Sequence, residues 1–331
     1  MLINLSNFIF LMTLISGTII SISSSSWLGM WIGIEMNLLS FIPLMNKNKT
    51  PYETESSMKY FLVQAMASII FLMGILTSEM NNFSMSIQPS YLISTALLMK
   101  MGAAPFHFWF PGVMEGIDWV NCFILMTWQK LAPFILISYK LMNNMIISTI
   151  FLSTFIGSIG GLNQNSLRKI MAYSSISHLG WMLSAMLISN NMWLMYFLIY
   201  MLLNLAMIFL FHSQDTFYLS QSFFIKYKPL MKFSMMISMM SLAGLPPFLG
   251  FLPKWIVIQN LMLNEMYIMT LFMVMTTLLT LYFYMRVMFS SFMFMNQELK
   301  WISNENNSSI TSISMMLSIA GIPILSYFMS Y

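Results

Sequence analysis

The chain has 331 residues, of which 58% are hydrophobic and only 7% are charged, with a formal net charge of +4. Soluble domains carry about 25% charged residues, so this composition excludes a soluble globular protein and indicates a protein with many spans in a lipid bilayer. The single cysteine, Cys122, excludes a disulfide framework and any iron–sulfur cluster held by cysteines of this chain. No phosphate-binding glycine loop follows a strand-like segment, and neither nucleotide chemistry nor a nucleic-acid partner is expected.

Eleven apolar runs are long enough to cross a hydrocarbon core of about 30 Å, which needs about 20 helical residues. In chain order they cover 2–22, 27–45, 58–79, 90–111, 119–142, 145–164, 169–189, 192–213, 233–263, 266–294 and 309–330. The connections are short, and none is large enough for a soluble domain. The sequence therefore predicts an all-α polytopic membrane protein that forms a single membrane domain over 1–331.

Basic residues are distributed unequally between the two sides of the membrane. The residues on the N-terminal side are Lys47, Lys49, Lys59, Arg168, Lys169, Lys226, Lys228, Lys232 and Lys300. Only Lys140 falls on the opposite side, and the remaining basic residues lie inside spans. Because connections rich in Lys and Arg stay on the cytoplasmic side, the N-terminus is predicted to face the cytoplasm, or the matrix in a mitochondrion.

The fourth apolar run carries a charge and a helix-breaking motif close to its centre. Within 91–111, Lys100 is followed by Gly-Ala-Ala-Pro at 102–105. A charge at the bilayer centre costs at least about 2.5–3.5 kcal/mol, and proline removes a backbone donor that lipid cannot replace. Together these features predict a helix interrupted beside a polar cavity, as at the ion sites of transporters. The alternative is a helix whose lysine side chain extends to the interface.

A short pattern, G-x-x-P-F-x4-P, occurs twice, from Gly102 to Pro111 and from Gly244 to Pro253. The two copies fall in the fourth and ninth predicted spans, and this odd offset gives them opposite orientations in the membrane. We therefore expect two inverted five-helix repeats, approximately 1–142 and 145–294, followed by a C-terminal helix at 309–330. Paired broken helices in inverted repeats predict the transport site.

Five ionisable residues lie within the predicted spans: Glu35, Lys100, Lys130, Lys254 and Arg286. A structural role is favoured for Arg286, because its side chain can extend to the interface. Simple pairing of Glu35 with one lysine would leave the other lysines uncompensated in a dry interior. Burial favours a neutral lysine, whereas a nearby carboxylate favours a charged one. We therefore predict that Glu35, Lys100, Lys130 and Lys254 form a proton relay.

Histidine could extend such a relay. His178 lies near the middle of the seventh span beside hydroxyl residues such as Ser174 and Ser177. It is either a relay residue or a packed core residue, and the same alternatives apply to His107 beside the first break. His212 lies at the end of a span and is interpreted as interfacial. Nothing in the sequence has the spacing of metal ligands, so no metal site is expected.

A family resemblance rests on five segments that follow one another along the chain: SWLGMWIGIEMNLLSFIPL, LLMKMGAAPFHFWFPGVMEG, MTWQKLAPF, GGLNQNSLRKIMAYSSISHLGWM and SLAGLPPFLGFLPKW. In these segments, and over essentially its whole length, the chain closely resembles the NADH dehydrogenase subunit 2 family, antiporter-like and Mrp-related membrane subunits of mitochondrial respiratory complex I. The resemblance implies a proton-pumping subunit of NADH:ubiquinone reductase. It also implies the shortened animal form, which lacks the first three helices of longer relatives.

The resemblance also implies residue roles. Glu35 matches the family's acidic partner of Lys100, Lys130 matches its bridging lysine, Lys254 its exit-side lysine and His178 a histidine on the same axis. Other membrane-arm subunits of complex I are the implied partners, in the mitochondrial inner membrane with the N-terminus on the matrix side. NADH, flavin, iron–sulfur clusters and ubiquinone are expected on other subunits, and no cofactor is expected on this chain.

Three functions remain open at this point: proton translocation driven by quinone reduction elsewhere in the complex, a stand-alone Mrp-type cation/proton antiporter subunit, and a structural spacer. The first makes a geometric prediction, that both breaks lie at mid-membrane depth. Lys130 should then lie between Lys100 and Lys254 in a lateral row, bridged by water or by hydroxyls such as Ser174 and Ser177.

Overall fold

The computed structural model describes residues 5–47, 50–79, 88–224, 229–292 and 315–316. Within these residues the regular structure is helical, apart from one isolated bridge between Ser166 and Tyr218. The prediction of an all-α membrane fold is confirmed. Apart from 315–316, the predicted C-terminal helix at 309–330 lies outside the described residues.

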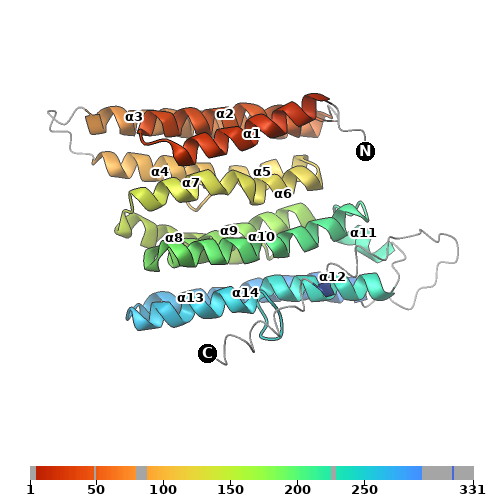
Figure 1. Ribbon diagram of the computed structural model, residues 1–331. Coiled ribbons are helices and arrows are strands. Elements are labelled where there is room, and N and C mark those ends of the chain that lie inside the picture. The colour runs from red at the N-terminus through yellow and green to blue at the C-terminus, as the bar shows by residue number, and fades with distance from the viewer. Residues whose placement is uncertain (1–4, 48–49, 80–87, 225–228, 293–314, 317–331) are drawn as a thin grey trace. The chain divides into compact units, whose positions relative to one another are not determined.

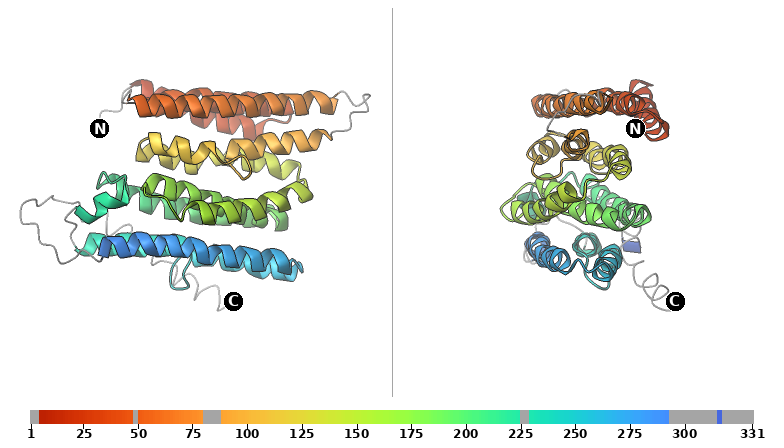
Figure 2. Two further views of the ribbon diagram at one scale, coloured as in Figure 1. Left: turned by 180° about the vertical axis from the view of Figure 1, so that it is seen from behind. Right: turned by 90° about the vertical axis from the view of Figure 1, so that its left-hand side faces the viewer.

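The chain divides into two compact units, Met1–Thr149 and Ile150–Tyr331. In the first unit three long helices form one layer and four shorter helices form a second (Figures 1 and 2). The helices are α1 (Leu5–Ser23), α2 (Trp27–Met45), α3 (Pro51–Glu79), α4 (Pro89–Met101), α5 (Trp109–Gly116), α6 (Trp119–Met126) and α7 (Trp128–Tyr139). Helix α3 packs on α4 and α5, and α4 packs on α7.

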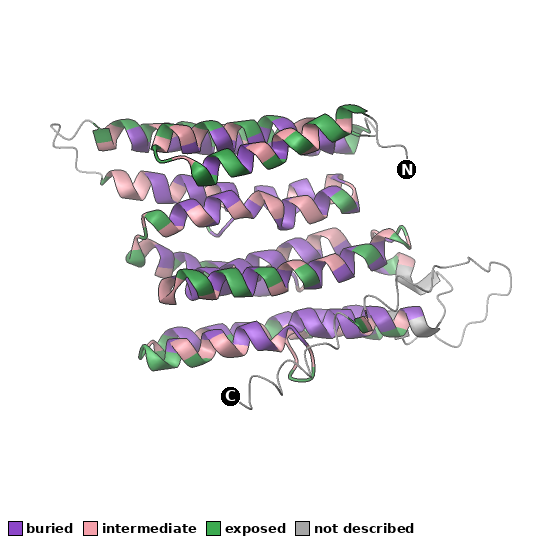
Figure 3. Ribbon diagram, viewed as in Figure 1, coloured by how far each residue is buried: buried purple, intermediate pink, exposed green. Residues whose placement is uncertain are grey.

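The second unit is also layered. Its helices are α9 (Leu167–Ile188), α10 (Asn190–His212), α11 (Leu219–Phe224), α12 (Pro229–Ala243), α13 (Phe251–Leu263) and α14 (Tyr267–Phe292), and α8 (Asn143–Gly160) enters it from the first unit. Helix α9 packs on α10 and α13, and α12 packs on α10 and α14. Most of α9 is buried, whereas one face of α10 is exposed (Figure 3).

Seven helical segments among the described residues are long and apolar enough to cross a membrane: Leu5–Ser23, Trp27–Met45, Pro51–Glu79, Trp119–Tyr139, Asn143–Gly160, Asn190–His212 and Tyr267–Phe289. The predicted spans 90–111 and 233–263 correspond to pairs of shorter helices, and 169–189 corresponds to α9. The total of eleven spans stays a prediction, as do the two inverted repeats. Large apolar side chains such as Leu62, Met66 and Ile69 are more than half exposed, as expected for a surface that faces lipid or apolar partners.

Both predicted breaks are present. Helix α4 ends at Met101, and Gly102 follows with a φ of 73°. Helix α12 ends at Ala243, and Gly244 follows with a φ of 82°. This left-handed backbone costs a residue with a side chain about 1–2 kcal/mol, which explains why glycine occupies both positions. The fifth predicted span contains a further irregularity at Thr127, which separates α6 from α7.

The carbonyl groups freed at the first break are hydrogen-bonded within the unit. The Trp109 indole Nε1 donates to the carbonyl oxygen of Met99 over 3.2 Å, and the Gln64 amide Nε2 donates to that of Lys100 over 3.3 Å. Lipid offers no donors to such carbonyls, so a break inside a membrane requires donors from the protein. Helix α3 and the start of α5 supply them here.

We expect Gly102→Ala to destabilise the first unit by about 1–2 kcal/mol, because alanine would have to adopt the left-handed backbone. Its Cβ would also lie 3.3 Å from the side chains of Phe110 and Trp109. Gly112→Ala is the matched control, because a Cβ there meets nothing within 4 Å. The measurement is the temperature at which the buried thiol of Cys122 becomes alkylated. Equal temperatures for the two variants would contradict the prediction.

Candidate functional site

Lys100 and Glu35 face each other inside the first unit. Lys100 lies in the last turn of α4 and is only 5% exposed, and Glu35 lies near the middle of α2. The Lys100 ammonium Nζ is 3.5 Å from the Glu35 carboxylate Oε1. Tight charge-assisted hydrogen bonds measure about 2.7–2.9 Å, so this pair is in contact but loosely held. The structure thus identifies Lys100 as the lysine that pairs with Glu35.

A chain of neutral polar side chains links three helices of the same unit. The Tyr60 hydroxyl on α3 donates to the Gln129 Oε1 on α7 over 3.4 Å, and the Gln129 Nε2 donates to the Asn37 Oδ1 on α2 over 2.9 Å. Tyr60 and Asn37 are each 3% exposed. The sequence analysis did not single out these residues. Their position could have identified them, because each is a polar residue within a predicted membrane span.

Lys130 directly follows Gln129 in the first turn of α7 and is 1% exposed. Its Nζ lies 5.1 Å from the centre of the Phe110 ring on α5, within the range of a cation–π interaction. Because α5 begins after the first break, this contact joins Lys130 to the far half of the broken helix. Glu35, Lys100 and Lys130 are therefore all held within the first unit.

Lys254 lies at the second break, in the first turn of α13. Its ammonium Nζ donates a hydrogen bond of 2.8 Å to the carbonyl oxygen of Ala243, the last residue of α12. The side chain is buried and passes over Gly244, where an added Cβ would lie 2.9 Å from the Lys254 Cδ. The carbonyl end of a helix carries partial negative charge, so it stabilises the ammonium that caps it.

His178 lies within the buried helix α9 of the second unit. Its ring Nδ1 is 2.9 Å from the hydroxyl of Tyr196 on α10, and its ring centre is 5.1 Å from that of Tyr200. All three side chains are buried. The hydroxyl partner could hold the ring in one orientation and one tautomer, which a proton carrier requires. The sequence analysis had not identified Tyr196.

The hydroxyl groups proposed to bridge the relay bond within their own helix. Ser174 donates to the carbonyl of Met171, and Ser177 donates to that of Ser174. Such bonds are common for serine in a helix and leave the oxygen able to accept a further bond. The lateral row of Lys100, Lys130 and Lys254 spans both units and stays a prediction.

Arg286 has the contacts of a structural residue. Its two terminal guanidinium nitrogens donate to the carbonyl oxygens of Leu162 and Gln164, in the segment that follows α8. These contacts support the structural interpretation of Arg286. His107 is buried at the first break, where its Nδ1 lies 3.2 Å from the carbonyl oxygen of Pro105.

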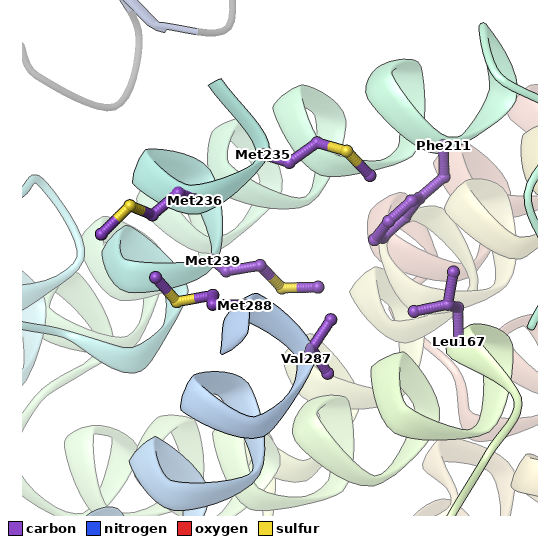
Figure 4. A pocket seen from close by; sticks show the side chains of 7 residues that line it. All are labelled: Leu167, Phe211, Met235, Met236, Met239, Val287 and Met288. Carbon is purple, nitrogen blue, oxygen red and sulfur yellow. The ribbon is translucent and has the colours of Figure 1, made fainter. Parts of the chain in front are cut away.

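A small cavity in the second unit has a lining rich in methionine. It measures about 20 Å³ and is lined by Leu167, Phe211, Met235, Met236, Met239, Val287 and Met288 (Figure 4). Its volume is close to that of one water molecule, but its walls lack the polar partners that a buried water needs. We interpret it as packing between flexible methionine side chains. Among the described residues, no three His, Cys, Asp or Glu side chains are placed to hold a metal ion.

Residues 24–280 match the family model for the transmembrane region of NADH:quinone oxidoreductase and Mrp antiporters. The chain is 51% identical to NADH-ubiquinone oxidoreductase chain 2 of Anopheles gambiae, over 97% of each chain. It is 44% identical to the protein of that name from Sus scrofa, over 88% of each. The chain belongs to the NADH-ubiquinone oxidoreductase chain 2 family. This finding confirms the resemblance noted in the sequence.

Two solved structures show that the fold of this chain 2 family member extends to distant proteins. A chain of respiratory complex I from Thermus thermophilus has a TM-score of 0.83 and 22% identity, covering 98% of this chain and 78% of that chain. A chain of the Mrp complex from Dietzia has a TM-score of 0.75 and 16% identity, covering 97% of this chain and 75% of that one. At these identities the likeness concerns the fold alone.

We expect Asn37→Leu to lower the stability of the first unit by about 1–3 kcal/mol, because it leaves the partly buried Gln129 amide without its acceptor. Asn144→Leu makes the same substitution at an exposed position, where the change should stay within about 0.5 kcal/mol. Alkylation of Cys122 during heating again provides the measurement. If Asn37→Leu lowers the stability no more than Asn144→Leu does, the Asn37–Gln129 hydrogen bond contributes nothing to the stability of the first unit.

Proposed function

We propose that this chain is a proton-translocating membrane subunit of a respiratory NADH:ubiquinone oxidoreductase. The observation that carries the proposal is the loosely held pair of buried Lys100 and partly buried Glu35 beside the first helix break, in a member of the chain 2 family. A buried charge of this kind is costly, and in membrane proteins it marks a site of ion or proton transfer. The energy would come from quinone reduction in other subunits.

The proposed relay begins at the first break. Lys100 holds a proton while the Glu35 carboxylate faces it, because the negative charge offsets the desolvation of the ammonium. Separation of the pair removes this compensation and favours release of the proton toward Lys130. The 3.5 Å separation means that little direct hydrogen bonding has to be broken. The position of Glu35 thereby controls whether Lys100 holds or releases its proton.

At the second break, Lys254 would receive the proton in a different environment. Its charged form is stabilised by the Ala243 carbonyl at the end of α12. Movement of α12 relative to α13 would break this contact and favour the neutral amine. His178, hydrogen-bonded to Tyr196, is the proposed carrier within the second unit.

The proposal includes a location and a set of partners. We place the chain in the mitochondrial inner membrane with its N-terminus on the matrix side, supported by the distribution of basic residues. Its partners are other membrane-arm subunits of complex I, as the names of its relatives and of the Thermus thermophilus structure suggest. NADH, flavin, iron–sulfur clusters and ubiquinone would bind to those other subunits.

A stand-alone Mrp-type antiporter subunit is the second candidate, because the Dietzia Mrp complex contains a chain of the same fold. The relatives from Anopheles gambiae and Sus scrofa, at 51% and 44% identity, carry the NADH-ubiquinone oxidoreductase name and favour the first candidate. The candidates differ in assembly. In mild detergent the chain should co-migrate with NADH dehydrogenase activity, whereas migration in a complex without that activity would favour the antiporter.

Lys100→Met should reduce the number of protons pumped per NADH oxidised and slow coupled turnover, while the complex still assembles. Methionine has a similar length but cannot hold a proton, so the change removes the proposed carrier and keeps an apolar side chain in place. The measurement is proton uptake by vesicles that contain the purified complex. A variant that retains the full proton stoichiometry would falsify the role of Lys100.

Lys59→Met is the matched control in the same unit. Lys59 forms an exposed ion pair with Glu55 on α3, and such pairs contribute little to structure or charge transfer. This variant should pump normally.

A purely structural role for the Lys100–Glu35 pair makes another prediction, that joint replacement of Glu35 and Lys100 by leucine leaves pumping unchanged. Loss of pumping in the double variant, with assembly retained, supports the relay.

A further inference from the structure

A large cavity lies between α10 and α13 in the second unit. Its volume is about 550 Å³, within the range of about 300–1,000 Å³ that is typical of ligand pockets. Its lining includes exposed residues such as Met195, so the cavity opens to the outside of the unit and can be entered from there. None of the residues assigned to the proton relay lines it.

The lining changes in polarity along the cavity. At one end lie two exposed neutral amides, Asn191 in the first turn of α10 and Gln259 in the second half of α13. Farther along α10 the wall is formed by apolar residues such as Met195 and Ile199, which face Val257 and others on α13. The two amides thus lie where α10 begins, and apart from Tyr196 and Trp255 the lining residues deeper in the cavity are apolar.

The length of the cavity corresponds to one leaflet of a bilayer. Asn191 and Ile199 are eight residues apart, which is about 12 Å along a helix at 1.5 Å per residue. Half of a hydrocarbon core of about 30 Å is of similar depth. Because α10 is a membrane-spanning helix, the cavity extends from one membrane face toward the bilayer centre.

We propose that this cavity binds one acyl chain of a zwitterionic phospholipid. The apolar walls fit the hydrocarbon chain and disfavour water, and the two amides can hydrogen-bond the ester or phosphate oxygens of the headgroup. The lining residues given by the structure include no Lys, Arg, Asp, Glu or His, so they offer no full charge that would select an anionic lipid. The bound lipid would enter the cavity from the surrounding bilayer.

The bound chain would lie against a residue of the relay environment. Tyr196, which is hydrogen-bonded to His178, also lines the cavity. An acyl chain at this position would keep water away from the Tyr196–His178 pair on this side. This consequence rests on the proposed function, whereas the lipid site itself does not.

The test uses the assembled complex in vesicles of phosphatidylcholine that include a phosphatidylcholine with a diazirine in its acyl chain. After illumination, mass spectrometry should find the lipid attached to peptides of α10 and α13 that line the cavity. In Ile199→Trp the indole fills the apolar part of the cavity, and labelling there should fall several-fold. Leu198→Trp is the control, because the neighbouring Leu198 is 54% exposed and does not line the cavity.

Labelling lost in Ile199→Trp and retained in Leu198→Trp supports the lipid site. Equal labelling in both variants and in the unsubstituted chain overturns it, because the label then reports only general contact with lipid. Attachment of a quinone photoprobe in place of the lipid, or of a neighbouring subunit by a cross-linker, also overturns it. If Ile199→Trp does not assemble, the same comparison is made with Met195→Phe, and the same outcomes decide.

Discussion

The hydrocarbon core of a membrane supplies no hydrogen-bond partners, so every interruption of a helix must be compensated by the protein itself. This constraint determines what surrounds both breaks. At Gly102, neutral donors from Gln64 and Trp109 satisfy the freed carbonyls. At Gly244, the ammonium of Lys254 does so. The groups that stabilise the breaks therefore lie directly beside the charges proposed to move protons.

The two breaks differ in the group that bonds the carbonyl oxygens at the end of the helix. At the first, neutral donors occupy the carbonyls, so the ammonium of Lys100 is directed to the Glu35 carboxylate. At the second, the ammonium itself caps the helix. A buried lysine held by a carboxylate responds to movement of a side chain on another helix, whereas one held by a helix end responds to movement of that helix. The two lysines are thus suited to different steps of one relay.

Much of the architecture was predictable because membrane helices obey strong local rules. Long apolar runs gave the helices, and the Gly-x-x-Pro motifs gave both breaks, since glycine and proline limit the local backbone. The burial of Lys100, Lys130 and Lys254 followed from their central positions in apolar runs. The irregularity at Thr127 could not be predicted, because no glycine or proline marks it.

The hydrogen-bond partners of polar residues inside the membrane helices could not be predicted from the sequence. The hydrogen bonds from Tyr60 to Gln129 and from Gln129 to Asn37 depend on the rotation of three helices about their axes. The contact of His178 with Tyr196 depends in the same way on how α9 packs against α10. An apolar pattern that covers nearly the whole circumference of a membrane helix leaves that rotation undetermined. Only tertiary packing determines it.

Proton transfer at the first break requires that Glu35 and Lys100 separate and re-form their contact during turnover. Infrared difference spectroscopy of the assembled complex, comparing the resting enzyme with the enzyme oxidising NADH, observes carboxylate groups directly. The expected result is a shift of a carboxylate band on turnover that is absent in Glu35→Gln. Turnover at the normal rate without any signal assignable to Glu35 would contradict it.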